Sequence, residues 1–258
     1  MTPLETLETA RRLIGTSRRM VAFTGAGVST ASGVADFRSP GGVWSRHRPV
    51  PFDEFLSSAE ARRRYWQYKK ESWFEMARAR PNAAHLLLAR LEAEERLLGV
   101  ITQNIDGLHQ AAGSRRVVEL HGTNLIVECL GCGRGSPADE IYARLEATAE
   151  PPPCGDCGGL LKPATISFGQ PLRSDVLAAA ERLVLGCDLL LVLGSSLVVY
   201  PAASLLPQAR AAGSKLVIVN RDSTPFDGLA DVVLHGEVEQ LLPSLAPRDG
   251  SPNGSGEK

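Results

Sequence analysis

Apolar runs of strand length alternate with apolar residues at helical spacing along most of the chain. The strand-length runs lie at residues 20–23, 97–102, 117–120, 188–193, 215–219 and 231–234. The helical patterns lie at residues 3–18, 53–79, 82–95, 137–145, 175–185 and 237–245, and a further helix begins at Pro201. Buried strands that alternate with helices are typical of a parallel sheet covered on both faces. The sequence therefore predicts an α/β fold with a doubly wound, Rossmann-like parallel sheet.

A glycine-rich turn follows the first apolar run. Gly25, Ala26 and Gly27 come directly after Thr24. Glycines at the end of a buried strand let the backbone approach a phosphate closely, in front of the N–H groups of the next helix. The dinucleotide-binding fingerprint is incomplete, because Thr30 stands where its third glycine is expected, so a plain strand-to-helix turn is an alternative. The polar residues behind the turn favour a nucleotide site with a closing loop: Ser29, Asp36, Phe37 and Arg38.

Polar side chains also follow the second and third apolar runs. Gln103, Asn104 and Asp106 come after the second run, and His121 comes after the third. Because ligands of open α/β sheets bind beyond the carboxyl ends of the strands, these residues are candidates for one site. His121 is the best candidate for a general base among the five histidines; a turn histidine held by hydrogen bonds is the alternative. His85 lies among leucines, and we expect it to be structural.

Two cysteine pairs give the most specific single signal. Cys129 pairs with Cys132 and Cys154 with Cys157, each in a C-x-x-C spacing with glycine beside it. Two such pairs are typical of one tetrahedral Zn²⁺ site, and four thiolates leave no position for a reactive water, so the zinc would be structural. Disulfides or a redox pair are the alternatives. Cys187 lies alone in an apolar stretch, and we expect it to be a buried small residue.

Composition and charge limit the classes of function. The chain has 258 residues and a formal net charge of −1, so no excess of basic charge indicates nucleic acid or an anionic membrane surface. No apolar run is long enough to span a bilayer, and the first residues lack the basic-then-apolar order of a signal peptide. With the paired cysteines, this favours a reducing cytosol, so we expect a cytoplasmic protein. The oligomeric state is open, and a monomer is expected.

The motifs and their order resemble those of the sirtuins, a family of NAD-dependent protein-lysine deacylases. The resemblance extends from residue 21 to about residue 245. It is carried by residues 25–29, 36–38, 102–106, 121–122, both cysteine pairs, residues 168–169, residues 194–196 and Asn220. It implies an NAD-binding sheet domain with a smaller inserted zinc-ribbon and helical module.

The resemblance implies a role for each site residue. His121 would take a proton from a ribose hydroxyl, and Asn104 and Asp106 would bind the nicotinamide end of NAD. The whole NAD site would comprise Gly25, Ala26, Gly27, Ser29, Asp36, Phe37, Arg38, Gln103, Asn104, Asp106, Gly194, Ser195, Ser196, Asn220, Arg221, Asp222 and Val238. Phe168, Gly169 and Val198 would line the acyl-lysine channel. The acylated protein or peptide would bind as an extended strand between the sheet domain and the zinc module.

The same resemblance implies the reaction. The carbonyl oxygen of the acyl-lysine would attack C1′ of the ribose as nicotinamide leaves, and the acyl group would end on ADP-ribose. Deacetylation is the expected activity, with NAD and Zn²⁺ as cofactors. Removal of longer or acidic acyl groups and protein mono-ADP-ribosyl transfer are the alternatives. A nucleic-acid-binding zinc-ribbon protein is a further alternative, which the near-neutral charge and the presence of His121 disfavour.

Several positions depart from the usual sirtuin pattern. Thr165 and Ile166 stand in place of a bulky aliphatic pair, and Gln170 replaces a common acid, so the peptide preference is open. Sirtuins specialised for succinyl or malonyl groups carry a Tyr and an Arg three residues apart, where this chain has Trp66 and Lys69. Lysine lacks the bidentate fork of arginine. An apolar pocket closed by Trp66 is therefore expected to prefer acetyl or a longer aliphatic acyl group over succinyl.

The expected division of the chain comprises three parts and a tail. The NAD-binding domain would consist of residues 1–42, 86–123 and 160–245, so that residues 160–170 return the chain to the main sheet. Residues 43–85 would form the cofactor loop and helical module, with Asp53 as a candidate helix N-cap. Residues 124–159 would form the zinc-binding module. Residues 246–258 are rich in Pro, Gly, Ser and charge, and we expect them to be disordered.

Overall fold

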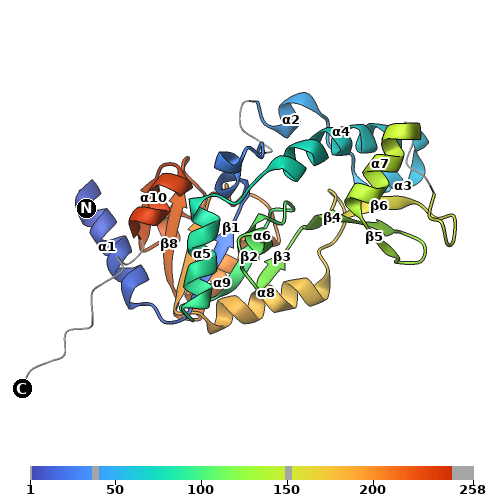
Figure 1. The fold of residues 1–258 in the computed structure, drawn as a ribbon. Helices are drawn as coiled ribbons and strands as arrows, with labels where there is room; N and C mark the ends of the chain where they lie inside the picture. Colours follow the sequence, from blue (N-terminus) through green and yellow to red (C-terminus); the bar gives the residue numbers. More distant parts are fainter. Residues whose placement is uncertain (1, 37–40, 149–152, 246–258) are drawn as a thin grey trace, which may run out of the picture.

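In the computed structural model of the protein, the described residues are 2–36, 41–148 and 153–245. They form a larger lobe around a six-stranded sheet and a smaller lobe around a three-stranded sheet (Figure 1). Phe37, Arg38 and the tail with its predicted disorder lie outside the described residues. Among the helices of the described ranges, none is both long and apolar enough to cross a lipid bilayer.

The larger sheet is parallel throughout, in the order β3-β2-β1-β7-β8-β9. Its strands are β1 (Met20–Thr24), β2 (Leu97–Thr102), β3 (Val117–Glu119), β7 (Leu189–Leu193), β8 (Lys215–Asn220) and β9 (Val232–His235). The strand order runs outward in opposite directions from the neighbours β1 and β7, and such a switch point is where doubly wound sheets bind their ligands. The predicted Rossmann-like parallel sheet is confirmed.

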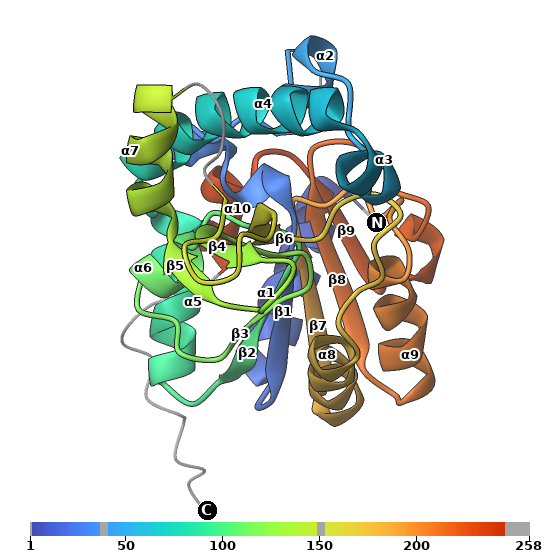
Figure 2. The ribbon, with the colours of Figure 1, turned by 90° about the vertical axis from the view of Figure 1, so that its right-hand side faces the viewer.

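Helices cover both faces of this sheet (Figure 2). One face carries α1 (Pro3–Thr16), α5 (Ala83–Ala93) and α10 (Val238–Leu245), and the other carries α8 (Ser174–Gly186) and α9 (Leu205–Ala211). Short helices complete the lobe, namely α6 (Leu108–Ala111) and the 3₁₀ helices η3 (Ala202–Ser204) and η4 (Asp227–Leu229). Along β1, Ala22 packs in one core and Phe23 in the other. Burial on both faces is the reason why these strands are continuous apolar runs.

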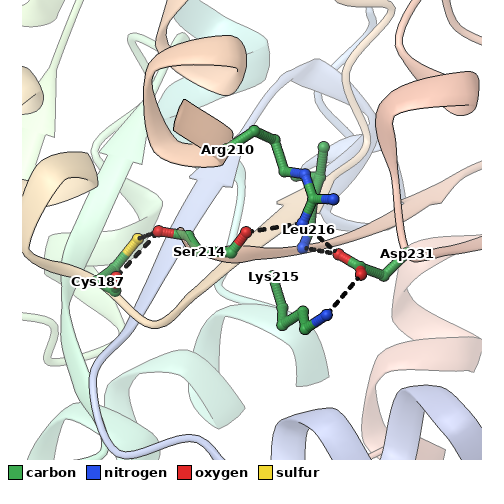
Figure 3. Close-up of polar contacts among 6 residues, drawn as sticks. All are labelled: Cys187, Arg210, Ser214, Lys215, Leu216 and Asp231. Carbon is green, nitrogen blue, oxygen red and sulfur yellow. Dashed lines mark hydrogen bonds and ion pairs between the residues drawn. The ribbon is translucent and has the colours of Figure 1, made fainter. Parts of the chain in front are cut away.

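A polar cluster ties together the starts of β8 and β9, at the end of the sheet away from the strand-end loops (Figure 3). The Asp231 carboxylate accepts from Arg210 Nη1 at 2.7 Å and from Lys215 Nζ at 3.1 Å. Arg210 also donates to the Ser214 carbonyl oxygen at 2.8 Å, and the Ser214 hydroxyl donates to the Cys187 carbonyl oxygen at 2.9 Å. Cys187 is buried, as predicted.

The smaller lobe contains an antiparallel sheet in the order β5-β4-β6. Its strands are β4 (Gly122–Cys129), β5 (Gly135–Pro137) and β6 (Leu161–Thr165), and its helices are α2 (Val43–Arg46), α3 (Phe52–Ser57), α4 (Ala59–Arg78) and α7 (Ala138–Thr148). Phe55, Tyr65 and Trp66 pack with Tyr142 and Val127 in its core. This lobe is the predicted smaller module.

Three predictions for this lobe are wrong. The segment at residues 160–170 does not return to the main sheet, because β6 pairs antiparallel with β4. Pro163 lacks an N–H donor, and an edge strand such as β6 tolerates it. The helix predicted over residues 53–79 is interrupted at Ser58, whose side chain accepts from the Ala61 N–H and caps α4. Asp53 lies in the first turn of α3 rather than at its N-cap.

Candidate active site

Two loops of small residues meet at the switch point of the larger sheet. One follows β1 at residues 25–27, and the other follows the adjacent strand β7 at residues 194–196. The Gly27 N–H donates to the Gly194 carbonyl oxygen at 2.8 Å. A Cβ atom on Gly27 would lie 2.8 Å from the Gly194 Cα, and one on Gly25 would lie 2.7 Å from the Gly194 carbonyl oxygen. Only glycine fits such a contact, and the bare backbone is open to close approach by a phosphate.

The α-helix predicted after the first glycine loop is absent. Residues 26–32 form two 3₁₀ helices instead, η1 (Ala26–Val28) and η2 (Thr30–Ser32), with Ser29 between them. Gly33, in the left-handed region at φ 84°, ends η2. Hydroxyl and β-branched side chains disfavour a continued α-helix in this segment. The backbone N–H groups of this loop therefore belong to tight turns and not to the N-terminus of an α-helix.

A cavity of about 560 Å³ opens beyond the carboxyl ends of the strands, between the two lobes. Most of the predicted site residues line it: Gly25, Ala26, Gly27, Asp36, Gln103, Asn104, His121, Phe168, Gly169, Gly194, Ser195, Ser196, Asn220, Arg221, Asp222 and Val238. Its volume is in the range of small-molecule and cofactor sites. The structure thus brings together residues that are spread over most of the chain.

Some predicted site residues lie elsewhere. Phe37 and Arg38 lie outside the described residues. Val198 is 50% exposed and is not part of the cavity wall, which includes the neighbouring Val199.

Arg221 and Asp222 line the cavity at its solvent-exposed side, where they form an ion pair at 3.0 Å.

Ser29, Asn104 and Asp106 form one hydrogen-bonded group. The Ser29 hydroxyl donates to Asp106 Oδ2 at 2.7 Å and accepts from Asn104 Nδ2 at 3.0 Å. The other carboxylate oxygen of Asp106 accepts from the Leu108 N–H at 2.9 Å. Ser29 and Asp106 line a second cavity of about 30 Å³, and Asn104 lines both cavities. An amide beside a carboxylate offers donor and acceptor groups, which fits a carboxamide ligand.

His121 lies between β3 and β4, and its ring is oriented by Gln103, the residue that follows β2. Its Nδ1 atom is 3.0 Å from the Gln103 carbonyl oxygen. Because a carbonyl oxygen only accepts, Nδ1 carries the proton in this contact, and the lone pair of the neutral ring is on Nε2. The Gln103 side chain in turn donates to the Ser195 hydroxyl at 2.8 Å. Gln103 therefore connects His121 to the loop after β7. With its lone pair on Nε2, His121 is suited to accept a proton.

A pair of buried histidines lies behind Ser29. The ring centroids of His85 and His109 are 4.8 Å apart, and His85 Nε2 is 3.5 Å from the Ser29 hydroxyl. Burial lowers the pKa of His85, and burial together with His85 lowers the pKa of His109 to about 3. Both rings are therefore neutral at ordinary pH. The structural role predicted for His85 agrees with this, but its contact with the site was missed because Ser29 is far away in sequence.

The four paired cysteines converge in the smaller lobe. Their Sγ atoms all lie within 4.8 Å of one another. Cys129 and Cys157 are 3.5 Å apart, and Cys132 and Cys154 are 3.8 Å apart, between sulfur atoms. A tetrahedral Zn²⁺ with Zn–S bonds of about 2.3 Å requires sulfur separations of about 3.8 Å. All four thiols are free, so the disulfide alternative is excluded, and the residues fit a structural zinc ion.

Comparison with known proteins decides the family. The family model described as the Sir2 family matches residues 25–201. This chain belongs to the Sir2 family. An NAD-dependent protein deacetylase of Rhodopseudomonas palustris is 43% identical over 232 residues, which are 89% of this chain and 92% of that protein.

Solved Sir2 structures have the same fold as this Sir2 chain. One, described as Sir2 with a deacetylated p53 peptide and 3′-O-acetyl ADP-ribose, has a TM-score of 0.86 and 39% identity, covering 93% of this chain and 96% of that chain. Another is described as Sir2 with a p53 peptide and NAD⁺. It has a TM-score of 0.83 and 40% identity, and the match covers 94% of this chain and 96% of that chain. The sirtuin resemblance stated from the motifs is confirmed.

The part of the cavity wall that α4 provides in this Sir2 chain differs from the prediction. Trp66 does not line the cavity, because its indole packs edge-on against Tyr142 of α7, with ring centroids 5.7 Å apart. Tyr68 and Lys69 of α4 line the cavity instead, together with Thr165 at the end of β6. The sequence places Trp66 and Lys69 one helical turn apart, but it does not show which of them faces α7. The prediction that Trp66 closes the pocket is wrong.

Proposed function

We propose that this Sir2 family member is an NAD-dependent protein-lysine deacetylase. The observation that carries the proposal is the position of His121, which is held by Gln103 in the same cavity as both glycine loops and Asn104. NAD would supply the ribose that receives the acetyl group, with nicotinamide as the leaving group. The relatives named as deacetylases, and the solved complexes with peptide, NAD⁺ or acetyl ADP-ribose, support this choice over ADP-ribosyl transfer.

We assign the cofactor contacts along the cavity by chemistry. The glycine loops after β1 and β7 would face the pyrophosphate, since they expose backbone and carry no bulky side chain. Asn104 and Asp106, joined through Ser29, would bind the carboxamide of nicotinamide. Asn220, at the end of β8, would lie with Arg221, Asp222 and Val238 at the adenosine half. Phe37 and Arg38 would close the loop over the nicotinamide end.

His121 would act as the general base. Its Nε2 atom would take the proton from a ribose hydroxyl, which then becomes the nucleophile toward the carbon of the acyl group. The Gln103 carbonyl oxygen, 3.0 Å from Nδ1, would stabilise the protonated ring and hold its orientation. A base fixed by a backbone group needs no reorganisation during proton transfer, which favours catalysis.

The acetylated peptide would lie across the mouth of the cavity as an extended strand. Phe168 and Tyr200, which are 49% and 68% exposed, both line the cavity together with Gly169, and the half-exposed Val198 is next in sequence to the lining residue Val199. Exposed apolar side chains beside a cavity are suited to hold a peptide. The lysine side chain would enter between them toward His121.

We assign the remaining parts of the chain as follows. The NAD-binding domain would comprise residues 1–42, 86–123 and 166–245, with its last boundary moved from 160 because β6 belongs to the smaller sheet. Residues 43–85 and 124–165 would form the helical and zinc-binding modules that carry one wall of the peptide site. A zinc ion on the four thiolates would cross-link the second module. We place the protein in the cytosol, where such thiols stay reduced, and we expect it to act as a monomer.

Nicotinamide release from NAD tests the proposed activity. The assay compares an acetyl-lysine peptide, the unmodified peptide and no peptide, with loss of the acetyl group followed by mass spectrometry. A deacetylase releases one nicotinamide for each acetyl group lost, and only with the acetylated peptide. Nicotinamide release with a mass increase of a protein and no loss of acetyl would favour ADP-ribosyl transfer. No release under any condition would refute both.

A further inference from the structure

Lys162 of β6 is a fully buried lysine whose side chain turns back onto its own strand. It is 2% exposed. Its Nζ atom donates to the carbonyl oxygen of Thr165, three residues later, and to that of Pro163 at 3.3 Å. The ring centroids of Phe52 and Tyr65 lie 5.9 Å and 5.6 Å from the same atom. Lys162 lines neither of the two cavities, so it can act on the site only through these neighbours.

Lys162 brings a positive charge into the core of the smaller lobe. Burial lowers its pKa to about 8, and the Glu128 carboxylate on β4 acts in the opposite direction, so the side chain is mainly a cation at neutral pH. A buried charge costs free energy, and a well-packed apolar side chain of similar volume is often equally stabilising or more so. Stability alone therefore does not account for a lysine at this position. Its role follows from the atoms that it holds.

The main acceptor of Lys162 begins a segment of the cavity wall. Residues 165–170 all line the large cavity, and Thr165 is the first of them. Next to the bond from Lys162 to Thr165, the Ile166 N–H donates to the His121 carbonyl oxygen at 2.8 Å. The end of β6 is thus fastened on one side by a buried cation and on the other by the residue that carries the proposed base.

The same Nζ atom also contacts the support of the other end of this segment. The N–H of Phe52, at the start of α3, donates to the Phe168 carbonyl oxygen at 2.9 Å. The Phe52 ring faces Lys162 at the distance of a cation–π contact. Hydrogen bonds from a charged donor are roughly twice as strong as neutral ones. One buried charge therefore connects the start of the segment, at Thr165, to the residue that holds Phe168.

We propose that Lys162 is a positioning residue for the substrate: its buried ammonium group holds residues 165–168 in the conformation that receives the acylated peptide. The inference rests on the proposed function, because Phe168 and Gly169 belong to a peptide site only if the chain acts on an acylated peptide. The two glycine loops assigned to the pyrophosphate follow β1 and β7 of the larger sheet. NAD binding should therefore not depend on Lys162.

Three variants separate this role from a contribution to stability. Lys162→Met keeps the apolar stem and removes the charge, so KM for an acetylated peptide should rise about tenfold, while kcat and KM for NAD should change less than about twofold. Its melting temperature should stay the same or rise, because a buried charge is lost. Lys162→Arg keeps the charge and should return KM toward the natural value. Lys70→Met, at a lysine of α4 that lines neither cavity, is the control and should match the natural enzyme.

These variants can also overturn the inference. A Lys162→Met protein that melts well below the natural enzyme would show that the lysine serves the fold. A Lys162→Met protein with the natural KM for the peptide would show that the charge does not serve peptide binding. A Lys162→Arg protein whose KM is no lower than that of Lys162→Met would exclude a role of the charge.

Hydrogen exchange followed by mass spectrometry locates the change. Within residues 165–170, the Ile166 N–H and the Gln170 N–H are hydrogen-bonded, so their exchange reports on the order of this segment. In Lys162→Met the segment should exchange at least about tenfold faster, while β1 and β7 exchange as in the natural protein. Equal exchange of residues 165–170 in both proteins contradicts the inference while deacetylation stands. A natural protein that removes no acetyl group, and whose segment the acetylated peptide does not protect, refutes the proposed function and this inference with it.

Discussion

The backbone carbonyl oxygen of Gln103 holds His121 through Nδ1, at 3.0 Å, and so directs Nε2 to be the basic nitrogen. We predict that His121→Ala lowers kcat/KM for deacetylation by at least about 10²-fold, the scale of general-base removal. The ring is only partly buried and lies between two strands, so the fold and NAD binding should persist. Steady-state kinetics and NAD titration check this. Near-full activity of the variant would exclude His121 as the base.

The close contact of the two glycine loops predicts that a side chain at Gly27 weakens NAD binding. A methyl group on Gly27 would meet the backbone of Gly194 at 2.8 Å, so Gly27→Ala should push the loops apart and weaken NAD binding by at least about tenfold. Gly15→Ala is the matched control, because Gly15 lies in α1 with open space around its Cα. The control should bind NAD normally and be slightly more stable. Calorimetric titration with NAD compares the two, and equal affinities would contradict the assigned pyrophosphate site.

Because Ser29 joins Asn104 to Asp106, we predict that loss of its hydroxyl impairs NAD binding and deacetylation. Ser29→Ala removes both contacts and leaves a buried carboxylate with one fewer donor. Deacetylation should fall on the order of 10-fold or more, with a higher KM for NAD. Ser32→Ala removes a hydroxyl from the neighbouring turn, whose partner is Asn82, and should change the kinetics little. If both variants behaved alike, the Ser29 group would have no part in NAD binding.

Zinc removal predicts a change that is confined to the smaller lobe. Metal analysis should give one Zn²⁺ per chain, and Cys129→Ser should lose it, since structural zinc contributes on the order of 10 kcal/mol to small modules. All three tryptophans of the chain pack in the core of this lobe or against it, so tryptophan emission reports on it selectively. In Cys129→Ser, the tryptophan emission should shift to longer wavelengths. The far-UV circular dichroism should keep the helical signal that the helices of the larger lobe contribute.

Cys187→Ser is the matched control for the zinc variant. Cys187 is buried in the larger lobe beside Ser214, away from the paired cysteines. The control should keep the metal and the tryptophan emission. A protein that carries no zinc, or a Cys129→Ser variant with unchanged metal content, would contradict the site.

The larger lobe could be predicted from the sequence because its signals are local. Each strand is buried on both faces, so β1, β2, β7 and β8 are short apolar runs between helical patterns. The zinc site was predictable for a similar reason: two C-x-x-C spacings leave few alternatives. The strand-end position of His121 was also visible, because parallel strands deliver their last residues to one edge.

The errors arose where distant contacts decide the structure. β6 contains Lys162 and Pro163 and does not resemble a strand, yet pairing with β4 and burial of the lysine stem stabilise it. Trp66 is turned away from the cavity by Tyr142, more than seventy residues later. The support of Ser29 by His85 likewise joins segments whose proximity no local pattern encodes. Hydrophobic periodicity indicates which face of a helix or strand is buried, but it does not show which other segment packs against that face.

The fate of the acetyl carbon tests deacetylation in this cavity most directly. A peptide whose lysine carries a ¹³C-labelled acetyl group is incubated with NAD and the protein, and the products are separated and weighed by mass spectrometry. Transfer with His121 as the base predicts that the label appears on ADP-ribose, in an amount equal to the nicotinamide released, and that His121→Ala abolishes this product. Label that remains on the peptide, or that appears only as free acetate without nicotinamide release, would contradict the proposed function.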